Sequence, residues 1–185
     1  ECMKSLLLAG GRSSRMGRDK ALIEVGGVAC IARVASALAA AGCEPIRIAV
    51  AQPEDVERYG SVMPDGLDVE WVLDAVTHAG PIEAVIEALT DPMVADSDSI
   101  QLCPVDVPWV TADLFFELEK TIGSGDLLAI PADPQRAHPL LARVRPSIAS
   151  KIAEDRRPLH VQFSEMEHST LSVSYTHLRA HETQP

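Results

Sequence analysis

The chain has 185 residues, 46% of them hydrophobic, and a formal net charge of −11 at pH 7. This size and apolar content suffice for one domain with a single sizeable core. The acidic balance disfavours a general nucleic-acid binder, whose surface is usually basic. No apolar run is long enough for a membrane span, and the short apolar start leads too soon into charge for a signal peptide. The four cysteines form no C-x-x-C pair, which argues against a zinc site or a redox motif and favours a reducing cytoplasm.

Strand-like apolar runs alternate with helix-like periodic segments. In chain order, the predicted elements are strand Lys4–Ala9, helix Ala29–Ala41, strand Ile46–Val50, strand Val69–Leu73, helix Pro81–Leu89, strand Ser99–Val105, helix Thr111–Ile122, and strands Asp126–Ile130 and Leu140–Val144. The strands are mostly continuous apolar runs, which is typical of strands buried on both faces. The alternation predicts an α/β fold with a mainly parallel sheet.

The residues that follow the predicted strands carry the polar chemistry. The first strand ends in Gly10 and Gly11 and leads into the cations of "RSSRMGRDK", the third ends in Asp74, and the fourth leads to Asp106. In open α/β sheets ligands bind beyond the carboxyl ends of the strands, so parallel strands bring these groups to one edge. Glycines admit phosphate oxygens close to backbone N–H groups, cations neutralise phosphates, and carboxylates hold Mg²⁺. The pattern indicates a nucleoside triphosphate bound with a divalent metal.

The glycine loop matches neither of the two commonest phosphate-binding motifs. Gly10-Gly11 has no Gly-Lys-Ser/Thr after it, as a Walker loop requires, and it is not G-x-G-x-x-G. An isolated Gly-Gly is more often a tight turn.

The full stretch "LAGGRSSRMGRDKAL" closely resembles the signature of the small nucleotidyltransferases, and the molybdenum cofactor guanylyltransferase family is the nearest match. "LDAVTHAGPIEAVIEAL", "CPVDVPWVTADL", "RAHPLLARV" and "DRRPLHVQF" are similar to further segments of that family, in the same order, so the resemblance covers Lys4 to Phe163. It implies a Rossmann-like three-layer α/β sandwich. It also implies transfer of GMP from GTP to the terminal phosphate of molybdopterin, with release of pyrophosphate and with recipient molybdoenzymes or their chaperones as further partners.

The resemblance also implies site residues. Nucleotide contacts fall on Leu8, Ala9, Gly10, Gly11, Lys20, Asp74 and Asp106, catalytic roles on Arg15, Lys20 and Asp106, and the Mg²⁺ ligand on Asp106. A phosphate monoester has a second pKa of about 6, so the attacking phosphate needs no general base at neutral pH. Other interpretations remain for some of these residues. Asp74 and Asp106 are also typical turn or cap residues, and His138 is a packed or surface histidine in the simplest interpretation.

Three departures from the family pattern keep alternative functions open. Ala49 stands where the family often has Asn, Glu83 and Ala84 replace the last two residues of G-P-L-A-G, and no Asn-x-Asn-Thr-Pro segment follows Phe163. The alternatives are a cytidylyltransferase for the same cofactor, a nucleotidyltransferase for a sugar or polyol phosphate, and a nucleotide-binding relative without catalysis.

The last segment differs from the rest of the chain. "SYTHLRAHETQP", residues 174–185, is polar and without period, and it looks like a foreign or disordered tail on a nucleotidyltransferase domain of residues 1–173. An ordinary frayed C-terminus is the alternative.

Overall fold

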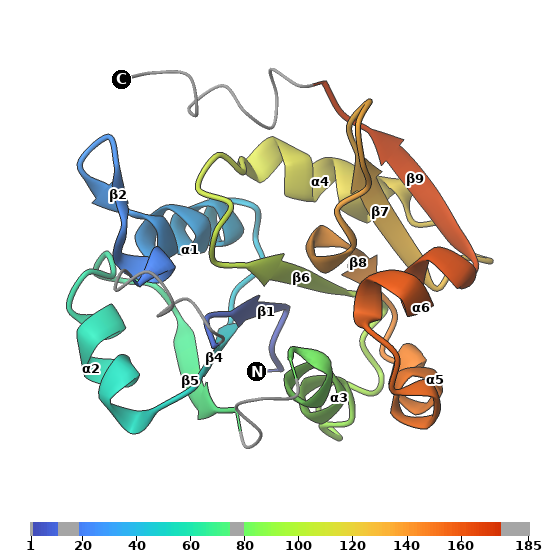
Figure 1. Cartoon of the computed structure of the whole chain (residues 1–185), viewed down its shortest axis with the longest axis horizontal. Helices are drawn as coiled ribbons and strands as arrows, with labels where there is room; N and C mark the ends of the chain where they lie inside the picture. Colours follow the sequence, from blue (N-terminus) through green and yellow to red (C-terminus); the bar gives the residue numbers. More distant parts are fainter. Residues whose placement is uncertain (1, 11–18, 75–79, 175–185) are drawn as a thin grey trace.

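The computed structural model describes residues 2–10, 19–74 and 80–174, and these form a seven-stranded sheet with helices on both faces (Figure 1). The strand order is β5 (Val69–Leu73), β4 (Ile46–Val50), β1 (Ser5–Leu8), β6 (Ile100–Pro104), β8 (Arg143–Val144), β7 (Leu128–Ala132) and β9 (His168–Ser172). Strand β8 is antiparallel to both of its neighbours, and the other pairs are parallel. The predicted α/β fold with a mainly parallel sheet is confirmed.

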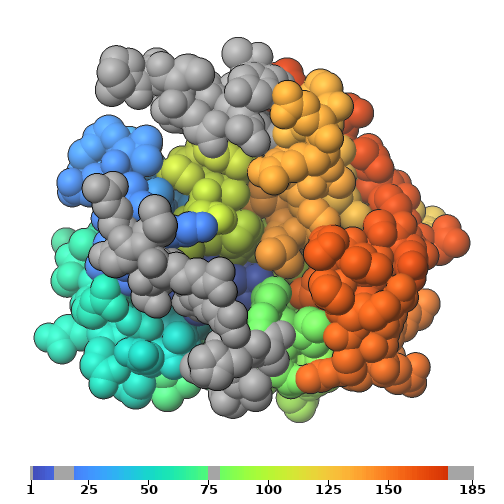
Figure 2. Space-filling view, viewed as in Figure 1, coloured from blue at the N-terminus to red at the C-terminus, as the bar shows by residue number. Residues whose placement is uncertain are grey.

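The two faces of the sheet bury separate helix layers because successive side chains of a strand point to opposite faces. Leu7 of β1 packs in the core with α1 (Cys30–Ala40), α2 (Pro53–Gly60) and α4 (Ala112–Thr121). Leu6 and Leu8 pack on the other face with α3 (Ile82–Leu89), α5 (Ile148–Asp155) and α6 (Leu159–Glu165). The result is a three-layer sandwich. Figure 2 shows that, on this face of the molecule, a yellow-green middle part of the chain lies between the blue N-terminal region and an orange C-terminal region.

The predicted helix ends follow from local chemistry. Helix α1 ends before Gly42, whose φ of 75° lies in the left-handed region that glycine adopts without strain. Thr111 caps α4, because its side-chain oxygen accepts a hydrogen bond from the amide of Leu114 at 3.3 Å. Cys30 and Cys103 are buried free thiols.

The prediction of a strand over Leu140–Val144 is wrong for its first part. Pro139–Leu141 form the 3-10 turn η3, and strand β8 comprises only Arg143 and Val144. Proline fixes φ and lacks the N–H that a central strand needs, so Pro139 starts a turn. Strand β5 also departs from the expectation of burial on both faces, because it lies at the edge of the sheet and is partly exposed.

The described residues contain further elements. The hairpin of β2 (Glu24–Val25) and β3 (Val28–Ala29) turns at Gly26 and Gly27, both with positive φ. Just before it lies the 3-10 turn η2 (Lys20–Leu22). Within the part of the chain that the structure describes, no helix combines the length and apolar character that crossing a bilayer needs.

Candidate nucleotide-binding site

A cavity of about 350 Å³ opens at the carboxyl ends of β1, β4, β5 and β6. Its position follows from the topology. The chain passes from β1 outward to β4 and β5 and then returns to β6 on the other side of β1, so the strand order reverses between β1 and β6. Ligands of open α/β sheets bind at such a switch point. The lining residues are Leu8, Ala9, Gly10, Lys20, Ala49, Ala51, Asp74, Gly80, Pro81, Pro104, Val105, Asp106 and Leu140.

The backbone after β1 forms the floor of this cavity. The amide of Ala9 donates to the carbonyl of Ala49 at 2.9 Å, which extends the parallel pairing past the last residue of β1. A Cβ placed on Gly10 would stand 3.6 Å from the amide nitrogen of Ala51 and 3.7 Å from Oδ2 of Asp74. The carboxylate of Asp74 therefore faces the backbone of Gly10, and a side chain at Gly10 would occupy the space between the strand ends.

Lys20 and Asp106 form an ion pair in the lining of the cavity. Nζ of Lys20 lies 3.9 Å from Oδ2 of Asp106, and the two side chains are 59% and 51% exposed. An ion pair at that distance and exposure contributes little to stability. Both groups are therefore accessible to a ligand that enters the cavity.

Asp19 fixes the turn that carries Lys20. Its Oδ1 accepts from the amide of Ala21 at 3.1 Å, and its Oδ2 accepts from the hydroxyl of Tyr59 at 2.7 Å and from Arg58 at 3.0 Å. Burial, followed by the hydrogen bond to Asp19, raises the pKa of Tyr59. Sequence reasoning missed these contacts, because Arg58 and Tyr59 lie on α2, far from the glycine-rich signature.

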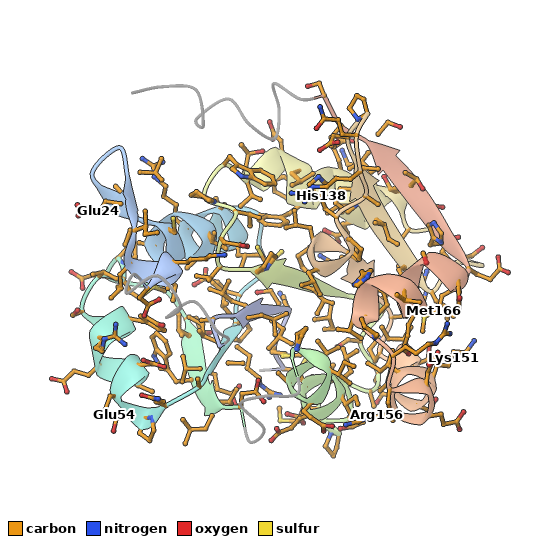
Figure 3. All side chains as sticks on the ribbon, viewed as in Figure 1. Glu24, Glu54, His138, Lys151, Arg156 and Met166 are labelled. Carbon is orange, nitrogen blue, oxygen red and sulfur yellow. The ribbon has the colours of Figure 1, made fainter. Side chains whose placement is uncertain are left out.

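His138, which Figure 3 labels, lies beside β7, where its amide donates to the carbonyl of Pro131 at 2.8 Å, and 9% of its side chain is exposed. Its Nε2 lies 2.8 Å from Oδ2 of Asp133, and its ring meets Trp109 edge-on with the ring centroids 6.0 Å apart. The hydrogen bond with His138 is the largest cause that lowers the pKa of Asp133 to about 2. His138 is thus a packed histidine, and Leu140, two residues further on, is the member of that segment that lines the cavity.

The structure brings together six of the residues that the resemblance implies, namely Leu8, Ala9, Gly10, Lys20, Asp74 and Asp106. Gly11 and Arg15 lie outside the described residues. Ala49 also lines the cavity, where its methyl group offers no hydrogen bond. Glu83, at the start of α3, is not among the lining residues of the cavity. Its carboxylate forms an ion pair with Arg156, the residue after α5 that Figure 3 labels.

The donor set suits a hard divalent cation that shares its ligands with phosphate. Among the described residues no group of three or more His, Cys, Asp and Glu side chains could hold a metal ion alone. Asp74 and Asp106 nevertheless line the same cavity. Mg²⁺ is usually held by one or two carboxylates together with substrate phosphates and water, so the residues present fit that mode of binding.

Comparison with known proteins agrees with this geometry. The MobA-like NTP transferase domain family matches residues 5–162. A molybdenum cofactor guanylyltransferase from Serratia proteamaculans is 32% identical over 155 residues, which cover 83% of this chain and 73% of the relative.

Solved structures share the fold. Molybdopterin-guanine dinucleotide biosynthesis protein A from Archaeoglobus fulgidus has a TM-score of 0.67 and 22% identity, over 96% of this chain and 86% of that one. Rv0371C from Mycobacterium tuberculosis H37Rv, in complex with manganese, has a TM-score of 0.69 and 17% identity, over 100% of both chains. The family match spans most of the sequence, and the cavity lies at the switch point of the sheet. The chain therefore belongs to the MobA-like NTP transferase family of nucleotidyltransferases.

Proposed function

We propose that this chain transfers GMP from GTP to the terminal phosphate of molybdopterin and releases pyrophosphate. One observation carries the proposal: a single cavity at the switch point of the sheet joins the Gly10 backbone, the Lys20 ammonium and the carboxylates of Asp74 and Asp106. A nucleoside triphosphate with a divalent cation needs this combination of donors, positive charge and oxygen ligands. The name of the Serratia relative, a molybdenum cofactor guanylyltransferase, supports guanylyl transfer to that cofactor.

The lining residues of the cavity suggest how a nucleoside triphosphate would bind there. The backbone of Leu8, Ala9 and Gly10 would lie against the nucleotide, where the bare Gly10 permits close approach. Lys20 would neutralise the phosphates, and its catalytic role would be to stabilise the charge that develops during transfer. Gly11 and Arg15 remain predicted nucleotide-binding and catalytic residues.

The proposed reaction needs positioning more than acid–base chemistry. An oxygen of the acceptor phosphate attacks the α-phosphorus of GTP, the bond between that phosphorus and the bridging oxygen breaks, and the oxygen leaves with pyrophosphate. The acceptor is already mainly a dianion at neutral pH, since its second pKa is about 6. Lys20 and Asp106 therefore serve to hold two anionic substrates in line and to balance their charge.

Asp106 would hold Mg²⁺ in this cavity, which the Asp74 carboxylate also lines. When bound, Mg²⁺ supplies positive charge at the phosphate oxygens. The Mycobacterium tuberculosis neighbour of the same fold was solved with manganese, a cation of similar ligand preference.

The proposal extends to where the protein works. The described cysteines Cys2, Cys30, Cys43 and Cys103 are all free thiols, which suits a reducing cytoplasm. There the product would pass to molybdoenzymes or to their chaperones.

Calorimetric titration of GTP, CTP, ATP and UTP, each with and without Mg²⁺, tests the nucleotide. We expect GTP with Mg²⁺ to bind most tightly. Ala49 on the cavity wall offers no side-chain hydrogen bond to a base, so CTP is the informative competitor. Preference for CTP would move the function to the cytidylyltransferase alternative, and the absence of any nucleotide binding would contradict both. Pyrophosphate release in the presence of molybdopterin then separates an enzyme from a nucleotide-binding relative.

A further inference from the structure

Asp19 connects the turn of Lys20 to a different part of the fold. Lys20 is the first residue of η2, and Asp19 is the residue that caps this turn through Oδ1. The second carboxylate oxygen is bound by Tyr59 and Arg58 of helix α2, which are 40 and 39 residues away in the chain. One carboxylate thus holds the Lys20 turn and attaches it to α2.

Two side chains of α2, Tyr59 and Arg58, hold the carboxylate of Asp19 in place. Tyr59 is 3% exposed and packs in the core, so its hydroxyl has a fixed position. The guanidinium of Arg58 reaches Asp19 through Nη2 and Asp55 through Nη1, at 3.0 and 2.8 Å. The side chains of Asp19 and Asp55 are 18% and 8% exposed. The Arg58 side chain itself is 48% exposed, so the buried part of the network is Tyr59 and Asp55 with the less exposed Asp19. Connected hydrogen bonds of this kind hold their members more firmly than an isolated surface ion pair does.

The same network reaches a second wall of the cavity. Asp55 accepts a hydrogen bond from the amide of Gln52 at 3.2 Å and so closes the start of α2. Gln52 directly follows Ala51, which lines the cavity beside Gly10. Helix α2 therefore fixes the end of β4 on one side and, through Asp19, the position of Lys20 on the other.

We propose that Asp19 is a positioning residue that acts on the triphosphate through Lys20. It holds η2 against α2 so that the Lys20 ammonium stays in the cavity lining, 3.9 Å from the carboxylate of Asp106. This inference rests on the proposed function, because the purpose of the fixed position is contact with the phosphates of a nucleoside triphosphate. Asp19 itself faces Ala21, Arg58 and Tyr59, so we assign it no contact with the ligand.

A double-mutant cycle tests this coupling. We expect Asp19→Ala to weaken binding of GTP with Mg²⁺ by roughly tenfold, as loss of a well-placed charge-assisted contact does. Lys20→Ala should weaken it at least as much. The double variant should bind no more weakly than Lys20→Ala alone, because a residue that acts through Lys20 has no effect once Lys20 is gone. Additive losses would overturn the proposal.

Asp91 provides a matched control. Its Oδ1 accepts from the amide two residues on, Met93, at 2.9 Å, and its Oδ2 accepts from Arg47 on another element at 2.6 Å, so it has the same local chemistry away from the cavity. Asp91→Ala should lower the melting midpoint and leave GTP affinity unchanged. A matching loss of affinity in Asp91→Ala would show that the effect of Asp19 is general destabilisation, which would overturn the proposal.

Amide hydrogen exchange tests the attachment of η2 to α2 independently of the proposed function. We call the bonds of Asp19 to Tyr59 and Arg58 the anchor of η2. In the protein without nucleotide, Tyr59→Phe and Asp19→Ala should both speed exchange in the peptide that contains residues 19–23, since each removes part of the anchor. Unchanged exchange in both variants would overturn the positioning role even if GTP binds. Faster exchange in both variants, together with a wild-type protein that binds no nucleotide, would contradict the proposed function and leave the anchor of η2 to α2 supported.

Discussion

Asp106 lies two residues beyond the end of β6, and its carboxylate forms an ion pair with the ammonium of Lys20 in the cavity lining. Asp106→Asn keeps the size of the side chain and removes the charge that would hold Mg²⁺. We expect pyrophosphate release with GTP, Mg²⁺ and molybdopterin to fall by a factor on the order of 10²–10³, the usual effect of losing one electrostatic group. The thermal melt should not change, because the pair with Lys20 is exposed and weak.

Asp98 is the matched control for that variant. It precedes β6 at the opposite end of the strand, is 85% exposed and pairs with Arg145 at 2.8 Å. The Asp98→Asn variant should release pyrophosphate at the same rate as the wild type. Wild-type turnover by Asp106→Asn would instead remove the metal-ligand assignment, and a collapsed melt would make Asp106 a structural residue.

At the residue scale, the sequence predicted the location of those cavity residues that directly follow the end of a strand or lie close to it. Asp74 follows the edge strand β5 and Asp106 follows the buried strand β6, so the parallel sheet brings both to one edge. The contact of Asp19 with Tyr59 follows from the packing of α2 on the sheet, and no local pattern near residue 19 encodes it. The same holds for Leu140, which reaches the cavity through the turn η3.

At the element scale, the loop from β7 to η3 is organised around one carboxylate. Oδ1 of Asp133 accepts from the amides of Gln135 and Arg136, and Oδ2 is bound by His138, whose ring packs on Trp109. Trp109 lies three residues beyond Asp106, so the loop from β7 to η3 packs, through His138, against the segment that follows β6. A strand through Leu140 was a natural expectation from the apolar run alone, but Pro139 and the Asp133 network favour a turn there.

This network makes a prediction about acid. The pKa of Asp133 is lowered from 3.8 to about 2, so its ionised form stabilises the fold at pH values above about 4, and that contribution is lost as pH falls toward 2. Asp133→Asn should therefore be less stable than the wild type in urea at pH 6, and the difference should shrink between pH 4 and pH 2. A difference that stays constant over this range would contradict the prediction.

His138→Phe is the control for the cause. The hydrogen bond from His138 is the largest contribution to the lowered pKa of Asp133. In the His138→Phe background, the loss of stability caused by Asp133→Asn should depend less on pH. An undiminished dependence would assign the effect to the backbone amides of Gln135 and Arg136.

At the scale of the whole molecule, the alternation of patterns predicted the parallel strands β1, β4, β5 and β6 and most of β7, but only the end of β8 and nothing of β9. Continuous apolar runs such as Ile46–Val50 are readable because both faces are buried. Strands β8 and β9 are short or half exposed, and their pairing with β7 depends on contacts distant in the sequence. Their order in the sheet therefore had no signal in the local sequence.

The C-terminal boundary of the domain gives the last prediction. Strand β9 pairs with β7, the amide of Val173 donates to Ala132 at 2.9 Å, and Leu171 and Val173 pack against the core. The predicted tail begins at Ser174, and residues 175–185 lie outside the described part. Removal of residues 175–185 should leave the melting midpoint and GTP affinity unchanged, because the sequence there has no apolar face to bury.

Truncation after Glu167 is the matched comparison, because it removes β9 together with the tail. That variant loses the burial of Leu171 and Val173 and leaves β7 as an unprotected edge, so its melting midpoint should fall by about 10 °C or the protein should aggregate. Differential scanning fluorimetry and size-exclusion chromatography of the two truncations decide the boundary. A clear drop in the midpoint on removal of 175–185 alone would show that the segment packs on the domain, and a stable variant lacking β9 would place the boundary before His168.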